Sequence, residues 1–394
     1  MANLWVSPNT ITGDAASGQR YLRREHINEY FWREVDKGNH ILFVAPRRVG
    51  KSSIMQDLAD NPPENYSCIY QNIEGVKSKS EFYNRLFDLI LQCASKTTKA
   101  KAFLNKCLAK YDIEEITKSS IKLKGKAIDY ESEIRNLIPG LKDSKINTVI
   151  FLDEFAEVIN KLNKQGFQQD AIDILHTLRE LRSNIDFKHF TLVYAGSIGL
   201  EFVINTIDRP KLINDLHRIK TDALTSDEAD KLIAQITAGA TIQLSAGTVD
   251  YLKTKINHLL PYYLQLMIEQ VDLIGRQKQQ PDITDDVIDE AFEQVIQENK
   301  NFDDWLIRLK DYHKDVFPFI NELLKYTANY DTITIQEIYN KANDTQFKRT
   351  DDYMDFVEQL MYDGYLVETQ KHVYRFISPF LQKFWLRKYP VYNG

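Results

Sequence analysis

The sequence has few cysteines and no long apolar stretch. Three of its 394 residues are cysteines, and none of the three belongs to a C-x-x-C pair. An odd number of isolated thiols argues against a disulfide framework and against a zinc site. No apolar run approaches the roughly 20 residues of a membrane helix, and the first residues lack the charged start and apolar run of a signal peptide. We therefore expect a cytoplasmic protein with reduced thiols and no membrane contact.

The sequence also lacks an excess of basic residues. Its 50 lysines and arginines stand against 56 aspartates and glutamates, which gives a formal net charge of −6. Nucleic acids and anionic membranes attract positive surfaces, so the overall charge favours neither as a general partner. Hydrophobic residues make up 43% of the chain, which is enough to fill buried cores, and the length favours two or three domains.

Short apolar runs alternate with helical patterns in the first half of the chain. Runs of this length are typical of strands buried on both faces, and their alternation with helices predicts a parallel α/β sheet. The predicted strands are His40–Ala45, Tyr66–Ile73, Thr148–Asp153, Phe190–Ala195 and, more weakly, Arg218–Ala223. Amphipathic helices are predicted at Glu81–Cys93 and Asp170–Arg182. The lysine-rich stretch 96–145 contains one expected hairpin, around Ser120–Lys126.

The pattern becomes helical after about Ala223. Thr225 and the acidic residues after it form an N-cap, and the helical reading continues to about residue 299, with expected breaks near Gly247 and Pro261. Three helices and a hairpin follow, in the order of a winged helix. Their expected ranges are Asp315–Tyr326, Thr334–Asn340 and Asp351–Tyr362 for the helices, and Tyr365–Glu368 and Val373–Phe376 for the strands. We therefore predict a core at 1–223, a helical lid at 224–300 and a winged helix at 301–394.

The segment Ala45-Pro-Arg-Arg-Val-Gly50-Lys51-Ser52 lies between a predicted strand and a predicted helix, which is the context of a Walker A loop. Backbone N–H groups of such a loop and of the helix N-terminus surround phosphates. Lys51 is expected to reach the terminal phosphates, and Ser52 to give a hydroxyl to Mg²⁺. Ala45 replaces the first glycine of the pattern. The expected nucleotide contacts in this segment are Arg47, Arg48, Val49, Gly50, Lys51, Ser52 and Ser53.

The predicted strand Thr148–Asp153 ends in two carboxylates. We expect Asp153 to hold Mg²⁺, directly or through a water molecule, and Glu154 to orient and deprotonate the attacking water. A buried strand that merely ends in a polar loop is the alternative, and the loop upstream favours the catalytic interpretation. Because a strand lies between the two motifs in sequence, the order fits the NTPase class with an additional catalytic glutamate. In that class the strand Phe190–Ala195 lies between the two motif strands, and Ser197 after it is our candidate γ-phosphate sensor.

These motifs resemble those of the AAA+ superfamily, and more closely the prokaryotic "archaeal ATPase" family, which is related to the STAND signalling ATPases. Segments that match the family lie along most of the chain. They are Tyr21-Leu-Arg-Arg24-Glu25 (for F-x-G-R-E, with Arg23 where glycine is usual), Pro46–Ser52, Phe151–Phe155, Leu224–Ala229, His258–Gln265 (with leucine where glycine is usual) and Tyr374–Phe380. The resemblance implies a P-loop NTPase core of the AAA+ type with a helical lid and a C-terminal winged helix.

The resemblance also implies roles that the residues alone do not. The segment with Leu22 and Arg24 borders the adenine in AAA+ proteins, and Pro261 is expected to pack against the adenine from the lid. Arg218, placed just before the last strand, is the candidate finger that acts on a neighbouring subunit, and Arg209 is the runner-up. A surface arginine is the alternative for each. No arginine stands in the sensor-2 region near Pro261, as in STAND-like switches.

The predicted winged helix carries little positive charge. Residues 301–394 contain 12 lysines and arginines against 14 aspartates and glutamates, and the helix in the recognition position is acidic. A DNA-binding surface requires the opposite sign, so we favour packing on the core or on a protein partner. The sequence thus predicts an ATPase that uses ATP/ADP and Mg²⁺, with a homo-oligomer as one expected state. A slow nucleotide switch acting through protein partners and a DNA-associated loader are the alternatives.

Overall fold

The computed structural model describes most of the chain. The described residues are 5–111, 113–116, 121–123, 128–142, 147–196, 199–207, 209–298, 300–312, 314, 316–345 and 353–392. They pack into two units. The sheet unit consists of Arg23–Ala45 and Lys51–Thr221, and the helical unit of the described parts of Met1–Leu22, Pro46–Gly50 and Asp222–Gly394. Among these residues, no helix is long and apolar enough to cross a membrane.

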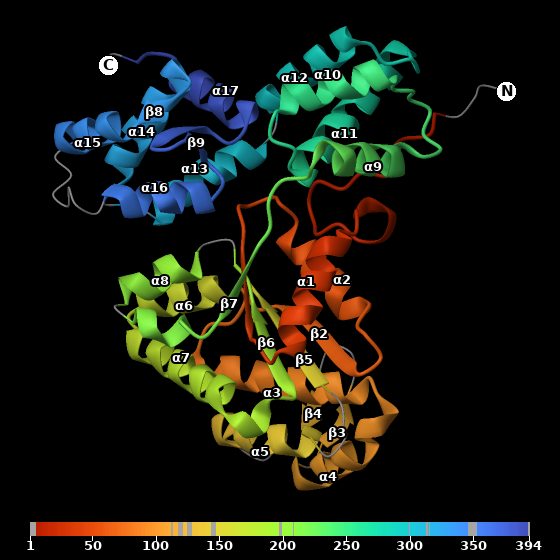
Figure 1. Ribbon diagram of the computed structural model, residues 1–394, viewed down its shortest axis with the longest axis vertical. Coiled ribbons are helices and arrows are strands. Elements are labelled where there is room, and N and C mark those ends of the chain that lie inside the picture. The colour runs from red at the N-terminus through yellow and green to blue at the C-terminus, as the bar shows by residue number, and fades with distance from the viewer. Residues whose placement is uncertain are drawn as a thin grey trace. The chain divides into compact units, whose positions relative to one another are not determined.

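A five-stranded parallel sheet forms the centre of the sheet unit (Figure 1). Its order is β2-β5-β6-β1-β7, and every neighbouring pair is parallel. The strands are β1 Ile41–Val44, β2 Tyr66–Asn72, β5 Asn147–Asp153, β6 Phe190–Tyr194 and β7 His217–Lys220. The predicted parallel α/β sheet is thus confirmed. One detail was wrong: Arg218 lies within the last strand rather than just before it, because β7 begins at His217 and pairs with β1 from there.

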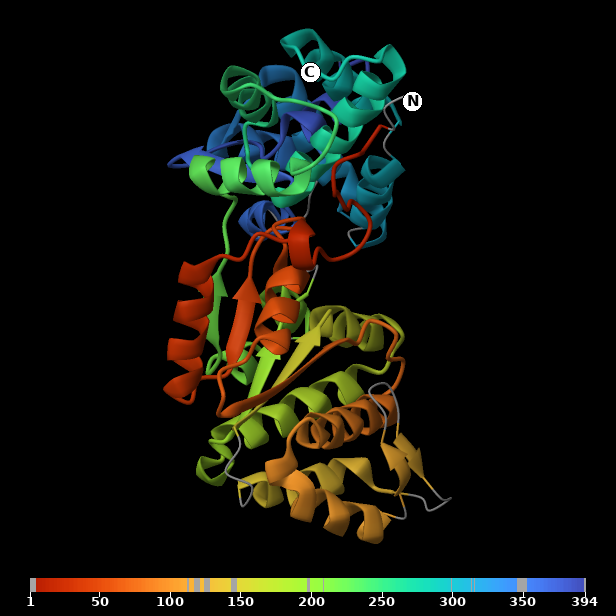
Figure 2. The ribbon, with the colours of Figure 1, turned by 90° about the vertical axis from the view of Figure 1, so that its right-hand side faces the viewer.

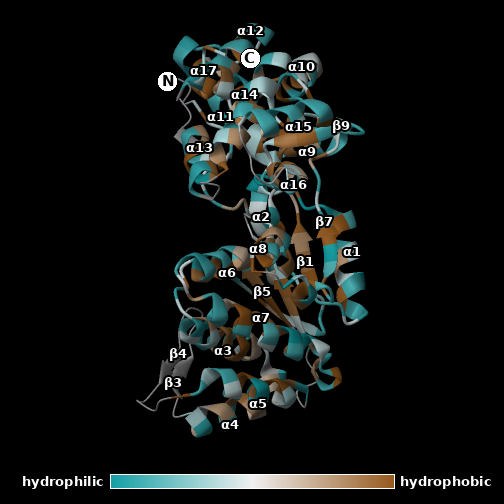
Figure 3. Ribbon diagram, turned by 90° about the vertical axis from the view of Figure 1, so that its left-hand side faces the viewer, coloured by the Kyte–Doolittle hydropathy of each residue, from teal (hydrophilic) through white to brown (hydrophobic). Residues whose placement is uncertain are grey.

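Aromatic side chains join the sheet to helices on both of its faces. The ring of Phe31, on α1, lies 5.9 Å from that of Phe43 on β1 and 5.6 Å from that of Phe151 on β5. Successive side chains of a strand point to opposite faces. Tyr194 is the register partner of Leu152, so it lies on the face opposite Phe151, where Arg182 of α7 contacts it. The strands β1 and β5 appear as apolar ribbons in Figure 3.

Eight helices are described in the sheet unit, with short 3₁₀ turns between some of them. They are α1 Glu25–Asp36, α2 Lys51–Asp60, α3 Lys79–Ser95, α4 Lys101–Tyr111, α5 Tyr130–Lys142, α6 Phe155–Lys164, α7 Gln168–Ser183 and α8 Leu200–Thr206. The helices predicted at Glu81–Cys93 and Asp170–Arg182 correspond to α3 and α7. An antiparallel hairpin of β3 Ile113–Ile116 and β4 Ile121–Leu123 begins earlier along the chain than the predicted one.

The first part of the helical unit is a group of four helices. They are α9 Ser226–Thr237, α10 Ala246–Ile256, α11 Pro261–Lys278 and α12 Asp285–Glu298. Thr225 and Glu228 form the predicted capping box at the start of α9. The predicted break near Gly247 corresponds to the segment between α9 and α10, and this glycine is the second residue of α10. Ser245 caps that helix, so the break precedes it.

Helices and a small antiparallel sheet make up the rest of the helical unit. The elements are α13 Lys300–Tyr312, α14 Phe317–Tyr330, β8 Ile333–Thr334, α15 Ile335–Asp344, α16 Tyr353–Tyr362, β9 Leu366–Gln370, β10 Val373–Phe376 and α17 Pro379–Lys388. The sheet has the order β8-β10-β9. The order from α14 to β10 is that predicted for a winged helix. A capping box at Thr334 and Glu337 begins α15, whereas α13 and α17 were not predicted.

The N-terminal segment packs along α11 within the helical unit. The indole N–H of Trp5 donates to Asp272 at 2.8 Å, the Ile11 N–H donates to the Gln265 side chain at 2.8 Å, and Thr12 donates to Glu269 at 3.0 Å. All three acceptors are on α11. Figure 2 shows this segment in red beside the green and teal helices. We call residues 5–22 the N-terminal strap.

Candidate functional site

The loop Ala45–Ser52 connects β1 to α2. Lys51 is the first residue of α2 and is buried, and its Nζ donates a hydrogen bond of 2.6 Å to the Ala45 carbonyl at the end of β1. Arg48 and Gly50 both have positive φ, 67° and 94°, which bends the backbone sharply between these ends. The lysine ammonium therefore lies against the first residue of the loop, in the sheet unit.

The carboxylate of Asp153, at the end of β5, accepts hydrogen bonds from residues of two other elements. The Ser52 hydroxyl on α2 donates to Asp153 Oδ2 at 2.6 Å, and the Tyr70 hydroxyl on β2 donates to the same oxygen at 2.7 Å. The backbone N–H of Glu154 donates to the other carboxylate oxygen at 3.0 Å. The side chain of Asp153 is buried, with 2% of the residue exposed. The two sequence motifs thus meet at a carboxylate whose oxygens are both engaged.

Tyr70 is a residue that the sequence analysis missed. In the register of β2 with β5 it faces Phe151, two residues before Asp153. Burial, the charge of Asp153 and the hydrogen bond to Asp153 together raise the pKa of Tyr70 above its usual range, so its hydroxyl stays a donor. Its only signal in the sequence is a hydroxyl-bearing residue near the end of a buried strand, a pattern that also fits an ordinary core tyrosine.

Glu154 stands in an unusual backbone conformation. Its φ of 59° and ψ of 27° are left-handed, and it occupies the N-cap of α6. A non-glycine residue pays roughly 1–2 kcal/mol for that conformation, and such strain clusters at functional sites. The following N–H, that of Phe155, donates to the Ala195 carbonyl after β6 at 3.0 Å and holds the turn. The half-buried carboxylate of Glu154 therefore leaves the sheet at its carboxyl edge, directly after Asp153.

The predicted sensor and finger residues are placed as follows. Ser197 lies outside the described residues, although its strand β6 lies between β1 and β5 as expected. Arg218 pairs with Glu201 of α8 at 2.5 Å and is about one-third exposed. Its strand β7 is the edge strand, three positions from β5, so roughly 14 Å separates the two strands. Arg209 is the exposed N-cap of a 3₁₀ turn at Pro210–Ile213.

The loop residues between Ala45 and Lys51 have their neighbours in the helical unit. The Arg48 guanidinium lies 4.2 Å from the ring centre of Tyr262 on α11, and that of Arg47 lies 6.0 Å from the ring centre of Trp305 on α13. Burial and the nearby charge of Arg308 lower the pKa of Arg47. Pro261, next to Tyr262, is the half-buried first residue of α11.

The remaining predicted contacts are spread over both units. Val49 and Ser53 are buried and Gly50 is half-buried. Leu22 ends the N-terminal strap in the helical unit and is half-buried. Arg24 is the buried N-cap of α1 in the sheet unit, where its carbonyl accepts from Ile27 and Asn28.

Ser52 and Asp153 bring a hydroxyl oxygen and a carboxylate oxygen together. Hydroxyl and carboxylate oxygens are the ligands that Mg²⁺ prefers, and at phosphate sites it takes few of them from the protein. Among the residues that the structure describes, no group of three or more His, Cys, Asp or Glu is placed to hold a metal. The oxygen pair of Ser52 and Asp153, already within 2.6 Å, matches a magnesium site that phosphates complete.

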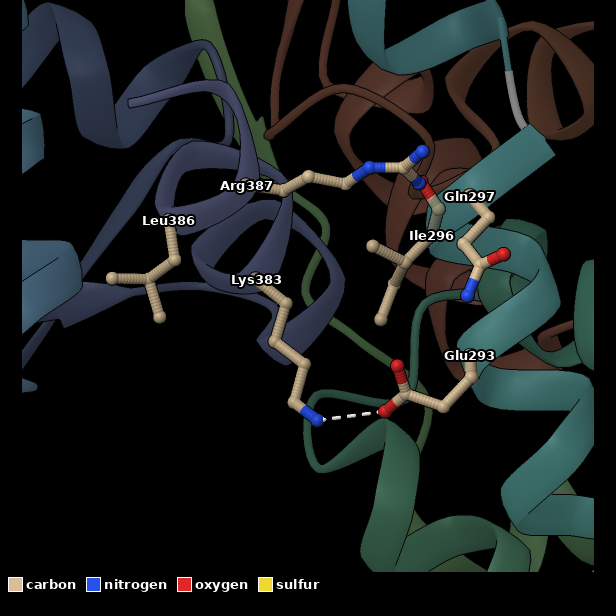
Figure 4. Close-up of a pocket in the computed structure, with 6 residues that line it drawn as sticks. All are labelled: Glu293, Ile296, Gln297, Lys383, Leu386 and Arg387. Carbon is tan, nitrogen blue, oxygen red and sulfur yellow. Dashed lines mark hydrogen bonds and ion pairs between the residues drawn. The ribbon is translucent and has the colours of Figure 1, made fainter. Parts of the chain in front are cut away.

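Two grooves in the helical unit lie away from these residues. One, of about 630 Å³, lies between α12 and α17, and Figure 4 shows Lys383 pointing to Glu293 across it at 2.9 Å. The other, of about 700 Å³, is lined by the residues from α9 to the start of α10. Neither is lined by a residue predicted to contact the nucleotide.

Comparison with known proteins identifies the fold. No protein-family model matches the sequence. No curated protein matches it. The Walker-type ATPase of Pyrococcus abyssi is similar over 95% of this chain and 99% of its own, with a TM-score of 0.63 and 13% identity. The ORC2 protein of Aeropyrum pernix, in ADPNP–ADP complexes, is similar over 99% and 98%, with a TM-score of 0.53 and 10% identity. The chain has the fold of the AAA+ P-loop ATPases.

The strand order of this fold explains how the loop and the acidic residues come to lie at one edge of the sheet. β6 separates β1, which leads into the loop, from β5, which ends at Asp153. Parallel strands present their carboxyl ends at one edge, and ligands of open α/β sheets bind outside that edge. The loop, Asp153 and Glu154 all follow strand ends at this edge, so the fold gathers them there.

Proposed function

We propose that the protein binds ATP with Mg²⁺ at the loop Ala45–Ser52 and hydrolyses it. The observation that carries the proposal is the 2.6 Å hydrogen bond between Ser52 and Asp153, which brings the phosphate loop and the acidic strand end to one point. The similarity of the fold to a Walker-type ATPase supports it. When bound there, Mg²⁺ neutralises charge that develops on the phosphates.

Each residue has a distinct role in this proposal. Lys51 gives a positive charge to the terminal phosphates, and the loop N–H groups surround them. Ser52 and Asp153 hold the cation, while Glu154 accepts a proton from the attacking water. Ser197 is proposed as the γ-phosphate sensor, and Leu22, Arg24 and Pro261 as neighbours of the adenine.

A nucleotide switch with slow turnover is the second candidate. Arg47 and Arg48 pack on aromatic rings of α13 and α11, so the loop shares its contacts with the lid and with the C-terminal helices. We propose that the nucleotide state is transmitted through these contacts to the lid (224–300) and the winged helix (301–394), from a core at 1–223. The chain is proposed to act in the cytoplasm, as a homo-oligomer or with a protein partner.

DNA binding is disfavoured as a function of the winged helix. The helix in the recognition position, α16, carries Asp355 and Glu358 and no basic residue between Tyr353 and Tyr362. Phosphate backbones repel such a surface. A loader that acts on DNA would have to use another face of the molecule.

The proposal is tested by nucleotide binding and steady-state ATP hydrolysis of the wild type and of Lys51→Ala. We expect wild-type turnover that requires Mg²⁺, and no detectable nucleotide binding by the variant, because the loop loses its charge on the terminal phosphates. Lys37→Ala, an exposed lysine at the end of α1, is the matched control and should behave as wild type. Tight ATP binding by Lys51→Ala would refute the assignment of the loop.

A further inference from the structure

Helix α4 and the residues just before it carry an excess of positive charge. Residues 95–111 contain five lysines and no aspartate or glutamate, in a chain whose formal net charge is −6. The residues on either side of them in the sheet unit, 79–94 and 112–142, contain eight basic and eight acidic residues. The positive excess of residues 79–142 therefore comes entirely from residues 95–111, which we call the lysine segment.

One side of α4 packs on its neighbours in the sheet unit. Cys107 and Tyr111 are buried, and the ring of Tyr111 lies 5.1 Å from that of Phe87 on α3. On α5, a Cβ built at Gly140 would lie 2.7 Å from the ring of Phe103, so this ring packs against the glycine. Figure 1 shows α4 beside α5 and the hairpin of β3 and β4. The other side of the helix faces solvent.

The lysines of the segment lie on the exposed side. Lys110 pairs with Glu133 of α5 at 2.6 Å, and Lys96 donates to the Cys68 carbonyl at 2.7 Å. The side chains of the other three form no ion pair in the part of the chain that the structure describes, and all are exposed: Lys99, Lys101 and Lys106. From Lys101 to Lys110 the helix axis advances about 13 Å. Over that length a nucleic-acid duplex presents about eight phosphates.

The exposed side of α4 offers charge without apolar anchors. Among the described side chains of this helix, the other exposed ones are Ala102, Asn105 and Ala109. Protein interfaces are centred on aromatic or large apolar side chains and are poor in lysine, and a helix on a membrane surface inserts an apolar face. The buried side chains of α4 are already packed within the sheet unit. A phosphate backbone, by contrast, attracts lysines as point charges and needs no apolar contact.

We propose that the lysine segment binds duplex nucleic acid through the phosphate backbone, without reading the base sequence. The exposed lysines at 99, 101 and 106, with no acidic residue among them, carry the inference. Single strands bind by stacking their bases on exposed aromatic rings, and Tyr111 of the segment is buried, which favours a duplex. The inference goes beyond the proposed ATPase activity and does not depend on it. It gives a DNA-associated role a face that is separate from the acidic α16.

The test uses two variants of the full chain, each with three exposed lysines replaced by glutamine, which has a helix propensity close to that of lysine. The segment variant combines Lys99→Gln, Lys101→Gln and Lys106→Gln. The control variant has the same net charge and combines exposed positions elsewhere in the sheet unit, Lys188→Gln, Lys211→Gln and Lys220→Gln. Binding to a short, fluorescently labelled duplex DNA of mixed sequence is measured by anisotropy between about 50 and 200 mM salt. Melting temperatures check the fold of each protein.

We expect wild type and the control variant to bind the duplex alike. The segment variant should bind about tenfold or more weakly at the lowest salt concentration. The slope of log K against log salt should fall by about 3 in magnitude, because each lost phosphate contact removes roughly 0.9. Duplex RNA should give the same order of affinities, and a change of DNA sequence should leave them unaltered. No nucleotide is added, so the result stands whether or not the protein hydrolyses ATP.

Two results with the duplex would overturn the inference. One is a wild type that shows no binding at micromolar protein and low salt, and the other is a segment variant that binds as tightly as the control variant. If the segment variant melts early, Lys101→Gln is measured alone, and its salt slope should fall by about 1. An unchanged slope in that variant would contradict the proposal as well.

Two other anionic partners are tested in parallel. Vesicles that contain phosphatidylserine represent a lipid surface. Sedimentation of the protein alone tests a second copy, whose residues 224–300 contain 13 acidic and six basic residues. Vesicle binding or self-association that the segment variant loses, while its duplex binding equals that of wild type, would assign the segment to that partner and overturn the inference.

Discussion

The hydroxyl of Tyr70 donates to the same Asp153 oxygen that accepts from Ser52. A carboxylate oxygen with two donors is oriented by both, so removing one loosens it. We expect Tyr70→Phe to raise the Mg²⁺ concentration needed for half-maximal ATP hydrolysis about tenfold, the scale of a lost hydrogen bond to a charged group. Tyr66→Phe on the same strand, whose hydroxyl donates to Asp36, should leave it unchanged. A Tyr70→Phe protein with the wild-type Mg²⁺ dependence would remove Tyr70 from the site.

Glu154→Gln keeps the size of the side chain and removes the base. We expect nucleotide binding to persist and hydrolysis to slow by about 10²-fold or more, the usual scale of general-base loss. Single-turnover measurements with saturating ATP separate this step from product release. Glu157→Gln, on the first turn of α6, is the control. An unchanged turnover number would take the role of base away from Glu154.

Because the backbone at Glu154 is left-handed, we expect glycine at this position to stabilise the fold although it removes the catalytic carboxylate. Glycine adopts this conformation without the steric cost that glutamate pays. We expect Glu154→Gly to raise the free energy of unfolding by up to about 1 kcal/mol relative to Glu154→Ala, measured by urea unfolding, while both lack hydrolysis. A Glu154→Gly protein less stable than the alanine variant would show that the strain is absent in solution.

Arg218 pairs with Glu201 on the surface of its own subunit. If Arg218 acts on the active site of a neighbouring subunit, its ion pair with Glu201 must open. The rate of ATP hydrolysis per subunit should then rise with protein concentration. Mixing Glu154→Gln with Arg218→Ala should give activity that is small but above both parents, because some sites then combine an intact Glu154 with an intact Arg218. Lys220→Ala, two residues later on β7, is the control and should keep the wild-type rate on its own. A rate independent of concentration, with no gain on mixing, would leave a monomeric switch.

His40 predicts a pH dependence of stability. Burial, with a further contribution from the charge of Arg182, lowers the pKa of His40 to about 3, and its Nδ1 accepts from the Leu192 N–H at 2.9 Å. The unfolded chain takes up this proton near pH 6.5 and the folded chain only near pH 3. Stability from this group is therefore complete above about pH 6.5 and falls as the pH drops toward 3, by up to about 1.4 kcal/mol per unit.

The comparison variant is His40→Asn, which keeps an acceptor near Leu192 and does not titrate. The free energy of unfolding is measured in urea at pH 7 and at pH 5. Between these two pH values it should fall less for His40→Asn than for wild type. His176→Asn, an exposed histidine on α7, should fall as wild type does. Equal pH dependence in wild type and His40→Asn would show that His40 is not the group responsible.

The sheet was predictable because each strand carries its own signal. The short apolar runs at β1, β2, β5, β6 and β7 have no helical periodicity, and buried parallel strands need no partner-specific pattern. Lys51, Ser52, Asp153 and Glu154 follow from local motifs for the same reason. The break near Gly247 was predictable too, and Ser245, two residues earlier, marks its end because it caps α10.

Contacts between segments far apart in the sequence could not be predicted from the sequence pattern. Tyr70 meets Asp153 across 83 residues, and inside a buried strand its side chain resembles any core aromatic residue. The side chains of Arg47 and Arg48 pack on Trp305 and Tyr262, respectively, which follow more than 200 residues later. Only the packed chain shows that two loop arginines are held by aromatic rings of α11 and α13.

The N-terminal strap has a consequence for the order in which the chain is made. Trp5 leaves the ribosome before its partner Asp272, which follows 267 residues later. All segments of the sheet unit are synthesised in between. The strap therefore lacks its partners on α11 until that helix emerges, while the sheet can already assemble. Protection of the Trp5 region should therefore follow assembly of the sheet, and a nascent chain halted before α11 should expose residues 5–22 to proteases.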